Sequence, residues 1–297
     1  MKHRWLMVCM VLVALVAGQL INGPTRDTQA EDQQPIPKDY ARILSLAPGI
    51  TESLYALGLA DRIVGVTDYC DYPADALTKP KVGGLYNMNL EAMLRQGPDL
   101  VICYPEHAPR NGPLRELGLN LLVVKHTSIS DILDYIDTIG RICSVEPASN
   151  SLLKDIKWRI ERIRQTHSQT PKVLICIGHD MESPSIENAY FVGIGGFFNE
   201  MIELTGGSNA YQGTVPFPVI SAEGILSLNP DIIIDMTPDL AQSDAFVYAQ
   251  WHSLGRLKAA HNKRIHVLTD DYVVIPGPRL VLTLEKIAQI VNQEKKG

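Results

Sequence analysis

Two hydrophobic patterns alternate between residues 41 and 143. Continuous apolar runs of four residues predict buried strands, which lie at Ile43–Leu46, Ile63–Val66, Leu100–Cys103 and Leu121–Val124. Apolar residues at helical spacing predict helices, which lie at Ile50–Leu57, Leu90–Arg95 and Ile129–Ile142. Short strands that alternate with helices are typical of a mainly parallel sheet with both faces covered.

The pattern changes after residue 147. Apolar residues at helical spacing, with charged residues on the other faces, predict one amphipathic helix over residues 148–169. About twenty residues form a rod of roughly 30 Å, long enough to connect two lobes. An ordinary surface helix of one lobe is the alternative. Beyond it, strands are expected at Val173–Ile177, Ile232–Asp235 and Ile265–Leu268, and a last helix at Pro278–Asn292.

One thirteen-residue pattern occurs twice, starting at Leu90 and again at Ala222. Each copy predicts a short helix that begins with a glutamate, Glu91 or Glu223, then a Pro-Asp corner and a buried strand. The segments 51–58 and 199–206 form a second matching pair, each a helix followed by glycine. The distance between the copies is too long for a solenoid, so the repeat predicts two related lobes.

We therefore expect an α/β protein with two Rossmann-like lobes of mainly parallel sheet, joined by one long backbone α-helix. The expected segments are a signal peptide at 1–30, a mobile arm at 31–40, an N-terminal lobe at 41–146, the connecting helix at 147–170 and a C-terminal lobe at 171–297.

The first thirty residues are typical of a secretory signal. Lys2 and Arg4 precede an uncharged apolar run from Leu6 to Ile21, too short for a typical membrane span, although an uncleaved anchor is the alternative. Without residues 1–30, 24 basic and 32 acidic residues remain, a net charge of −8. We expect a soluble periplasmic monomer, and an acidic protein of this kind argues against nucleic acid as a partner.

Neither the cysteines nor the histidines form a recognisable chemical motif. The periplasm permits disulfides between the four remaining cysteines, but buried free thiols are equally open. These cysteines are Cys70, Cys103, Cys143 and Cys176. No histidine pair has the spacing of a metal-binding helix, and no catalytic motif is found, so we expect no enzyme and no resident metal or cofactor.

Polar and aromatic residues gather where the predicted strands end, at residues 69–72, 104–107, 179–181 and 270–272. Ligands of open α/β sheets bind outside the carboxyl ends of the strands. His179 in this set could be an axial ligand to cobalt or haem iron, although a hydrogen-bonded loop histidine is the commoner case. Arg279 is expected to contact an anionic group or to form a salt bridge.

Several of these stretches resemble one family. Residues 43–52, 64–73 and 81–84, together with Asn89-Leu90-Glu91, Pro98–Ile102, Ser221-Ala222-Glu223 and Asn229-Pro230-Asp231, are similar to the cobalamin- and siderophore-binding periplasmic proteins of ABC-type importers. The resemblance covers roughly residues 41–290 and is strongest to the cobalamin-binding members. It implies a partner, an inner-membrane permease with its ATPase subunit, onto whose arginines Glu91 and Glu223 dock.

The resemblance also implies a set of ligand contacts. The matching positions are Tyr69, Leu85 or Tyr86, Tyr104, Asp271 and Tyr272. This sequence departs from the family at Leu85, where an aromatic residue is expected, and at Val273 or Val274, where an arginine is expected. The expected ligand is cobalamin or another corrinoid. A ferric siderophore or haem is the first alternative, and a bare metal ion is the second.

Overall fold

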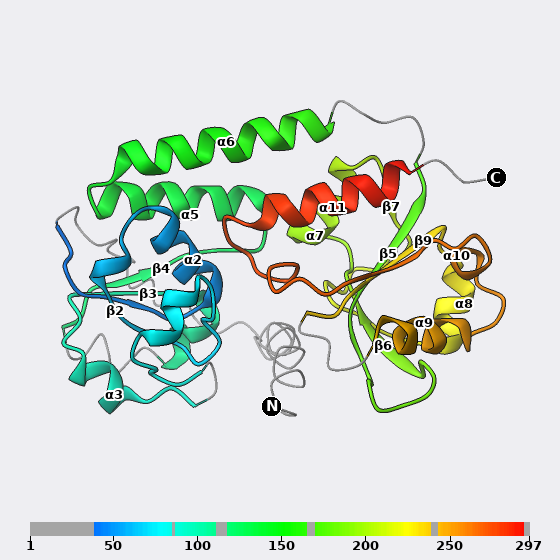
Figure 1. The fold of residues 1–297 in the computed structure, drawn as a ribbon, viewed down its shortest axis with the longest axis horizontal. Coiled ribbons are helices and arrows are strands. Elements are labelled where there is room, and N and C mark those ends of the chain that lie inside the picture. Colours follow the sequence, from blue (N-terminus) through cyan, green and yellow to red (C-terminus); the bar gives the residue numbers. More distant parts are fainter. Residues whose placement is uncertain (1–38, 85–86, 111–117, 165–169, 239–242, 294–297) are drawn as a thin grey trace. The chain divides into compact units, whose positions relative to one another are not determined.

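The computed structural model describes residues 39–84, 87–110, 118–164, 170–238 and 243–293. They fall into two compact units (Figure 1). The N-terminal unit ends at Lys157 and includes Pro276–Pro278, and the C-terminal unit holds Trp158–Ile275 and the chain from Arg279 onward. The predicted signal peptide, most of the predicted arm, Leu85 and Tyr86 lie outside the described residues.

The N-terminal unit is built on a four-stranded sheet. Its strands are β1 (Ile43–Ser45), β2 (Ile63–Val66), β3 (Leu100–Cys103) and β4 (Leu121–Val123). They run parallel in the order β2-β1-β3-β4, as the alternating pattern predicts. The helices are α2 (Pro48–Ala56), α3 (Leu90–Arg95) and α5 (Ile129–Ile142), with 3-10 turns at Ala60–Arg62, Ala74–Thr78 and Pro105–Arg110.

Alternate residues of β1 and β3 point to opposite faces of this sheet, as strand geometry requires. Leu44, Leu46, Val101 and Cys103 share one buried cluster with Met93 of α3. α5 begins at Ser128, which forms a reciprocal capping box with Asp131. Its isoleucines repeat at helical spacing and are buried, so local propensity and packing agree for this helix.

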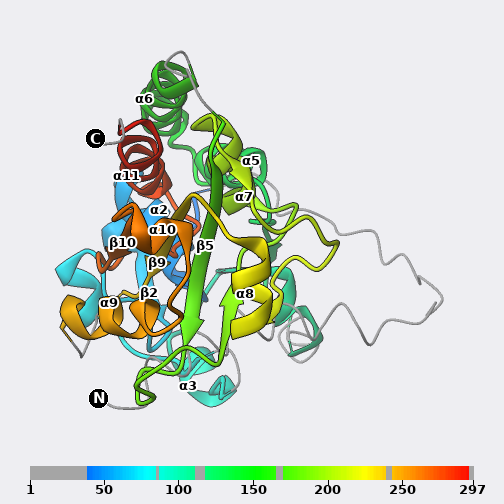
Figure 2. The same cartoon turned by 90° about the vertical axis from the view of Figure 1, so that its right-hand side faces the viewer.

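The C-terminal unit has a larger, mixed sheet. Its strands are β5 (Lys172–His179), β6 (Asn188–Phe191), β7 (Ser208–Asn209), β8 (Val219–Ser221), β9 (Ile232–Met236) and β10 (Ile265–Leu268). The order is β10-β9-β5-β6-β8, with β7 also paired to β5. β9, β10 and β7 are parallel within the sheet, whereas β6 is antiparallel to both β5 and β8. Figure 2 faces this unit, with β5 as the long central arrow.

Helices cover both faces of this sheet. They are α7 (Phe197–Leu204), α8 (Ala222–Leu228), α9 (Asp244–His252), α10 (Lys258–His261) and α11 (Leu280–Asn292). Residues of α8, α9 and α10 share a buried cluster with Leu174, Cys176 and Ile233 of the sheet. On the opposite face of β5, Val173 packs beside the turn that follows α7, and α11 contacts α7. The fold class predicted from the sequence is confirmed for both sheets.

The long helix α6 runs from Glu146 to Arg164. It is a single element, as the apolar spacing predicts, and the division between the units falls within it, after Lys157. Leu153 and Ile156 are buried in its first part, and Ile160 and Ile163 in its second. Arg159 forms a two-pronged ion pair with Glu285 of α11, with nitrogen–oxygen distances of 2.8 and 2.6 Å. That pair fixes the second part of α6 to the C-terminal unit.

The two copies of the sequence repeat fold alike. In the first, the Asp99 carboxylate accepts hydrogen bonds from the backbone N–H groups of Ala41 and Arg42, each at 3.0 Å. In the second, Asp231 accepts from the N–H of Lys172 at 2.9 Å. The strands that follow pair with β1 and β5 in the same register, Leu100 beside Ile43 and Ile232 beside Val173. The Pro-Asp corner therefore aligns the start of two neighbouring strands in each unit.

The sequence pattern misses the antiparallel part of the C-terminal sheet. β6 holds only three apolar residues, and β8 is an edge strand with two, of which Val219 is 56% exposed, so both are shorter than the four-residue apolar runs that predict strands elsewhere. α9 and α10 were also not predicted. The last helix begins at Leu280 and not at Pro278, and Arg279 is its N-cap residue.

Gly49 allows the segment Pro276–Pro278 to pack closely against α2. A Cβ atom at this position would lie 2.2 Å from the carbonyl oxygen of Pro276, so a glycine is required where the first turn of α2 meets this segment.

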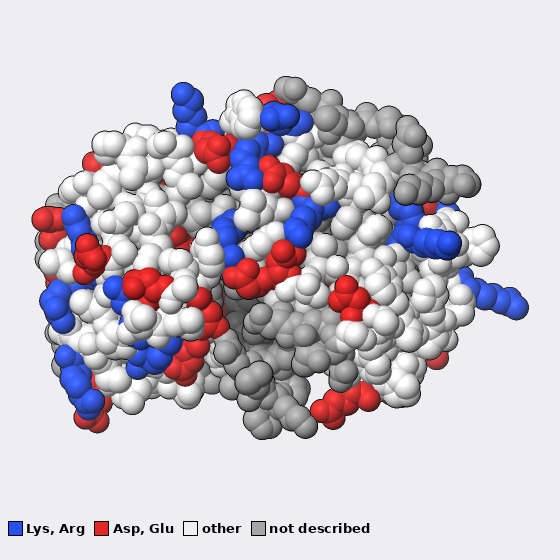
Figure 3. Space-filling view, in the orientation of Figure 1, with Lys and Arg blue, Asp and Glu red and all other residues white. Residues whose placement is uncertain are grey.

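No helix in the described part of the chain is long and apolar enough to cross a membrane. On the face drawn in Figure 3, acidic and basic side chains are interspersed and form no large basic patch. This surface agrees with the net charge of −6 for the whole sequence.

Candidate functional site

The two repeated glutamates stand in the first turn of matching short helices. Asn89 caps α3 by accepting from the N–H of Ala92 at 2.9 Å, and Ser221 caps α8 by accepting from Gly224 at 3.3 Å. Each glutamate comes two residues after its cap and is exposed to solvent. The caps fix where each helix begins and leave the carboxylates on the surface.

The surroundings of the two carboxylates differ. Glu91 pairs with Arg95 one turn later, at 2.7 Å, and the side chains are 84% and 69% exposed. The structure records no ion pair for Glu223 within the described ranges. The pKa of Glu223 is lowered, because its carboxylate accepts from its own backbone N–H and from the Ser221 hydroxyl. Glu223 is therefore ionised at neutral pH and available to a cationic partner.

Tyr69 lies after β2 and is partly buried. A Cβ atom on Gly84 would approach its ring to 2.7 Å, so the ring packs on the backbone just before position 85. The other two candidates of this region, Leu85 and Tyr86, lie outside the described residues. A ligand contact for these three positions stays a prediction.

Tyr104 follows β3 and is only 7% exposed. Its hydroxyl and that of Tyr135 both donate to the carbonyl of Pro276, at 3.2 and 2.7 Å. Its ring stacks on His126, with centroids 3.9 Å apart, and burial raises the pKa of its hydroxyl well above the usual value. Tyr104 thus serves the packing of the N-terminal unit, and a ligand contact for it stays a prediction.

A glutamate–histidine pair lies beside Tyr104. Nε2 of His126 is 3.3 Å from the Glu106 carboxylate, and the side chains are 8% and 25% exposed. Burial opposes ionisation of Glu106, but its hydrogen bond to His126 and the charge of that ring lower its pKa overall. The sequence points to Glu106 as a strand-end residue, but it does not predict this pair because His126 comes from the end of a different strand.

Asp271 and Tyr272, after β10, form one cluster with two basic residues. Arg279 pairs with Asp271 at 2.9 Å and lies over the Tyr272 ring, 5.2 Å from its centroid. Lys286 of α11 pairs with Asp270 at 2.7 Å. Burial would raise the pKa of Asp270, but the hydrogen bond and charge of Lys286 lower it. The salt bridge expected for Arg279 is confirmed, and its partner is another candidate ligand residue.

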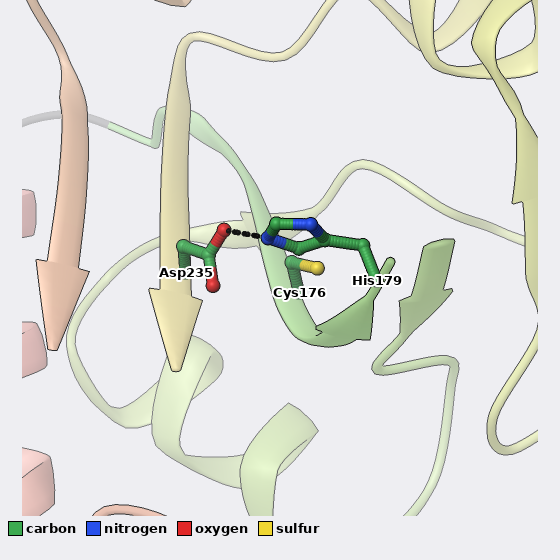
Figure 4. A group of neighbouring side chains, drawn as sticks. All are labelled: Cys176, His179 and Asp235. Carbon is green, nitrogen blue, oxygen red and sulfur yellow. Dashed lines mark hydrogen bonds and ion pairs between the residues drawn. The ribbon is translucent and has the colours of Figure 1, made fainter. Parts of the chain in front are cut away.

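His179 lies in the core of the C-terminal unit and not in an exposed loop. Its Nε2 is 2.9 Å from the carboxylate of Asp235 in β9, and both side chains are 0% exposed (Figure 4). Burial would lower the pKa of His179, but the hydrogen bond and charge of Asp235 raise it above the usual value. An axial-ligand role for His179 stays a prediction, and it would require the surrounding core to open, because the side chain is fully buried.

Asp235 organises a wider network. Its carboxylate also accepts from the indole N–H of Trp251 at 2.6 Å and from the Thr237 hydroxyl. The thiol of Cys176 completes a group whose ligand atoms lie within 4.8 Å of one another. In Figure 4 the Asp235 carboxylate points to the His179 ring, not to the sulfur. Three donors already satisfy this carboxylate, so the group has a sufficient explanation without a metal ion.

The four cysteines of the described region are buried and free. Of the two alternatives left open by the sequence, the structure therefore has buried thiols and not disulfides. Cysteine is among the most often buried residue types. Burial raises the pKa of the Cys143 thiol to about 12, so this side chain stays protonated.

The predicted ligand residues thus form separate groups within each unit. Tyr69 and Tyr104 belong to the N-terminal unit, while His179, Asp271 and Tyr272 belong to the C-terminal unit. Of these residues, Asp271 and Tyr272 lie together in a charged cluster, whereas Tyr104 and His179 are buried.

A family model described as periplasmic binding protein matches residues 43–272, most of the chain and both units. The chain belongs to this family. The family consists of substrate-binding proteins of transporters, which confirms that the chain is a binding protein and not an enzyme. The resemblance inferred from the sequence motifs is confirmed.

Two curated relatives cover most of the chain. A vitamin B12-binding protein of Vibrio cholerae is 28% identical over 266 residues, which are 89% of this chain and 92% of that protein. An ABC transporter substrate-binding lipoprotein of Bacillus subtilis is 29% identical over 277 residues, 90% of this chain and 85% of that protein.

Solved structures show the same fold. The periplasmic vitamin B12 binding protein of Vibrio cholerae has a TM-score of 0.73 at 26% identity, over 86% of this chain and 98% of that one. A possible iron-binding, periplasmic solute-binding protein of Staphylococcus epidermidis has a TM-score of 0.71 at 27% identity, over 86% and 100%. A periplasmic heme-binding protein in complex with two hemes reaches 0.71 at 23% identity, over 84% and 97%, which supports the fold alone.

Proposed function

We propose that this chain is the substrate-binding component of an ABC-type importer, and that it captures cobalamin or a related corrinoid in the periplasm. The similarity to the vitamin B12-binding protein of Vibrio cholerae carries this proposal, because it extends over 89% of the chain and 92% of the relative. The N-terminal segment 1–30, with its basic start and apolar run, serves as the export signal. The protein has no resident cofactor, and its cargo is the cobalt corrinoid itself.

Arg279 supplies a positive charge that positions 273 and 274 lack. Val273 and Val274 are 1% and 7% exposed and belong to the core. The Arg279 guanidinium instead pairs with Asp271 and covers the ring of Tyr272. We assign these three side chains to the contact with polar groups at the rim of the corrinoid. Arg279→Ala is expected to weaken corrinoid binding about tenfold, and the exposed Arg256 offers a matched control.

Calorimetric titration of the purified protein with cyanocobalamin, cobinamide, haem and a ferric siderophore tests the ligand. Submicromolar binding of the two corrinoids, with weak or no binding of the others, is the expected result. Tight binding of haem or the siderophore without corrinoid binding would retain the transport role and reject the corrinoid.

An iron chelate is the second candidate, favoured by the likeness to the possible iron-binding protein of Staphylococcus epidermidis at 27% identity. The same titration separates the two candidates. A bare metal ion receives less support, because the carboxylate of the one buried group of potential metal ligands within the described residues already accepts internal hydrogen bonds.

Delivery to the inner-membrane permease and its ATPase completes the proposal. Glu91 and Glu223 are exposed in matching helices, one in each unit, and their carboxylates suit arginine side chains of a partner. Charge reversal at both positions, Glu91→Lys with Glu223→Lys, should abolish transport in proteoliposomes and leave the calorimetric affinity for ligand unchanged. A loss of ligand affinity would assign the glutamates to the structure of the units instead.

A further inference from the structure

Each repeated glutamate has an exposed leucine on the same helix, three residues later. Leu94 follows Glu91 and is 39% exposed, and Leu226 follows Glu223 and is 37% exposed. Residues three apart lie on the same helical face. Met93 and Ile225, one position earlier, are 1% and 0% exposed, so a different face of each helix packs in the core. Each unit therefore presents a carboxylate and a leucine together.

These leucines stand out against the rest of the surface. Eight large hydrophobic side chains are exposed in the described part of the chain, and two of them occupy the same position of the repeat. The eight are Tyr72, Leu77, Leu94, Trp158, Ile194, Val215, Val219 and Leu226. A single exposed leucine needs no explanation. The recurrence of an exposed leucine beside the same carboxylate in both units does need one.

We propose that Glu91 with Leu94 and Glu223 with Leu226 are two copies of one docking epitope for the permease, in which the leucine anchors an apolar contact beside the ion pair. The occupant has an arginine flanked by apolar side chains, because a guanidinium can bind the carboxylate while its aliphatic stem packs on the leucine. Two copies of one epitope fit a partner that presents two equivalent surfaces. This inference rests on the proposed transport function.

The apolar contact has a specific physical role. A solvent-exposed ion pair contributes little, because water and salt screen it. A leucine that excludes water from one side of the ion pair in the complex strengthens that pair, as the contacts around the central residues of an interface do. The leucine should therefore contribute affinity both directly and through the neighbouring carboxylate.

The test measures binding of the full chain to its cognate permease–ATPase complex in lipid nanodiscs, by surface plasmon resonance. Leu94→Ala and Leu226→Ala should each weaken binding roughly tenfold, and the double variant by roughly a hundredfold. Leu77→Ala is the matched control, because Leu77 is 58% exposed and lies outside the repeat; it should bind as the unaltered protein does. Circular dichroism and ligand titration should be unchanged in all variants.

A double-mutant cycle distinguishes an epitope from independent contacts. Glu223→Gln should weaken binding less in the Leu226→Ala background than in the unaltered protein. If the leucine double variant binds within twofold while the glutamate variants lose binding, this inference fails and the proposed function stands. If the unaltered protein does not bind the complex, both fail. A dimer of this chain that the leucine variants dissociate would assign the epitope to self-association and also overturn the inference.

Discussion

The two units share one strand–helix repeat but differ in chemistry where its central strands end. In the N-terminal unit, Leu46 and Cys103 share an apolar cluster at the ends of β1 and β3. At the equivalent positions of the C-terminal unit, Cys176 pairs in register with Asp235. An apolar strand end needs only good packing, whereas a buried carboxylate such as that of Asp235 needs hydrogen-bond donors. Here these donors come from three separate segments of the chain.

The difference shows what such a network requires of the fold. His179 comes from the last position of β5, Thr237 from the residue after β9, and Trp251 from α9. All three residues lie outside the two copies of the thirteen-residue pattern. The same backbone pattern can therefore enclose either an apolar cluster or a hydrogen-bonded carboxylate. The residues outside the repeat decide which of the two is stable in each unit.

The largest expected effect on the free energy of unfolding comes from removing Asp235, the centre of this hydrogen-bond network. Asp235→Ala would leave the buried His179 ring and the Trp251 indole N–H without their acceptor and should destabilise the protein by about 3–5 kcal/mol. Cys103→Ala, at the equivalent N-terminal position, replaces a thiol buried in an apolar cluster and should cost about 1–2 kcal/mol. Urea unfolding followed by circular dichroism measures both. Equal losses would mean that the two strand ends are energetically alike despite their chemistry.

The Pro-Asp corners test whether the repeat has the same role in both units. Asp99→Ala removes the acceptor of two backbone N–H groups, and Asp231→Ala removes the acceptor of one and the ion-pair partner of Lys258. We expect losses of about 1.5–3 kcal/mol for each, because hydrogen bonds to charged groups are stronger than neutral ones. The same urea experiment applies, with Asp→Asn variants as controls that keep an acceptor oxygen. A neutral effect in one unit only would show that its strands align without the corner.

The pH dependence of stability should come in part from His179. Its pKa is raised in the folded state, so its stabilisation is fully present below the unfolded value of about 6.5 and is lost as pH rises through the folded pKa. The slope in that window is at most about 1.4 kcal/mol per pH unit. Thermal unfolding between pH 6 and pH 9 should therefore show a fall in Tm that His179→Gln reduces. An unchanged pH profile in the variant would indicate that the folded ring is neutral.

The smallest effect concerns the two docking helices. Arg95 pairs with Glu91, while the equivalent position in α8 is Ser227. Arg95→Ala should free the Glu91 carboxylate and strengthen binding to the permease by about twofold to threefold, since exposed pairs contribute about 0–1 kcal/mol. Surface plasmon resonance at low and physiological salt measures this, with the surface residue Arg141, paired to Asp137, as a matched control. Weaker binding would instead assign Arg95 to holding Glu91 in its docking position.

The sequence by itself determined much of the architecture. The apolar runs at 43–46, 63–66 and 265–268 predicted β1, β2 and β10 to within one residue, because a buried strand needs a continuous apolar run. The apolar spacing over 129–142 predicted both ends of α5, whose start the capping box at Ser128 fixes. The repeated motif predicted the paired Glu helices, and the tertiary structure shows both glutamates exposed. The family resemblance read from the same stretches is confirmed by the match over residues 43–272.

The tertiary structure alone decided the surroundings of the candidate side chains. Tyr104 follows β3 and His179 is the last residue of β5, where exposed ligand residues are expected, yet both are buried beside partners distant in sequence, Pro276 and Asp235. The four cysteines remain free for a similar reason, since each packs within a core. Local patterns determine which segments become strands and helices, because periodicity acts over a few residues. The burial and pairing of these two side chains depend on residues 172 and 56 positions away, whose approach no local pattern encodes.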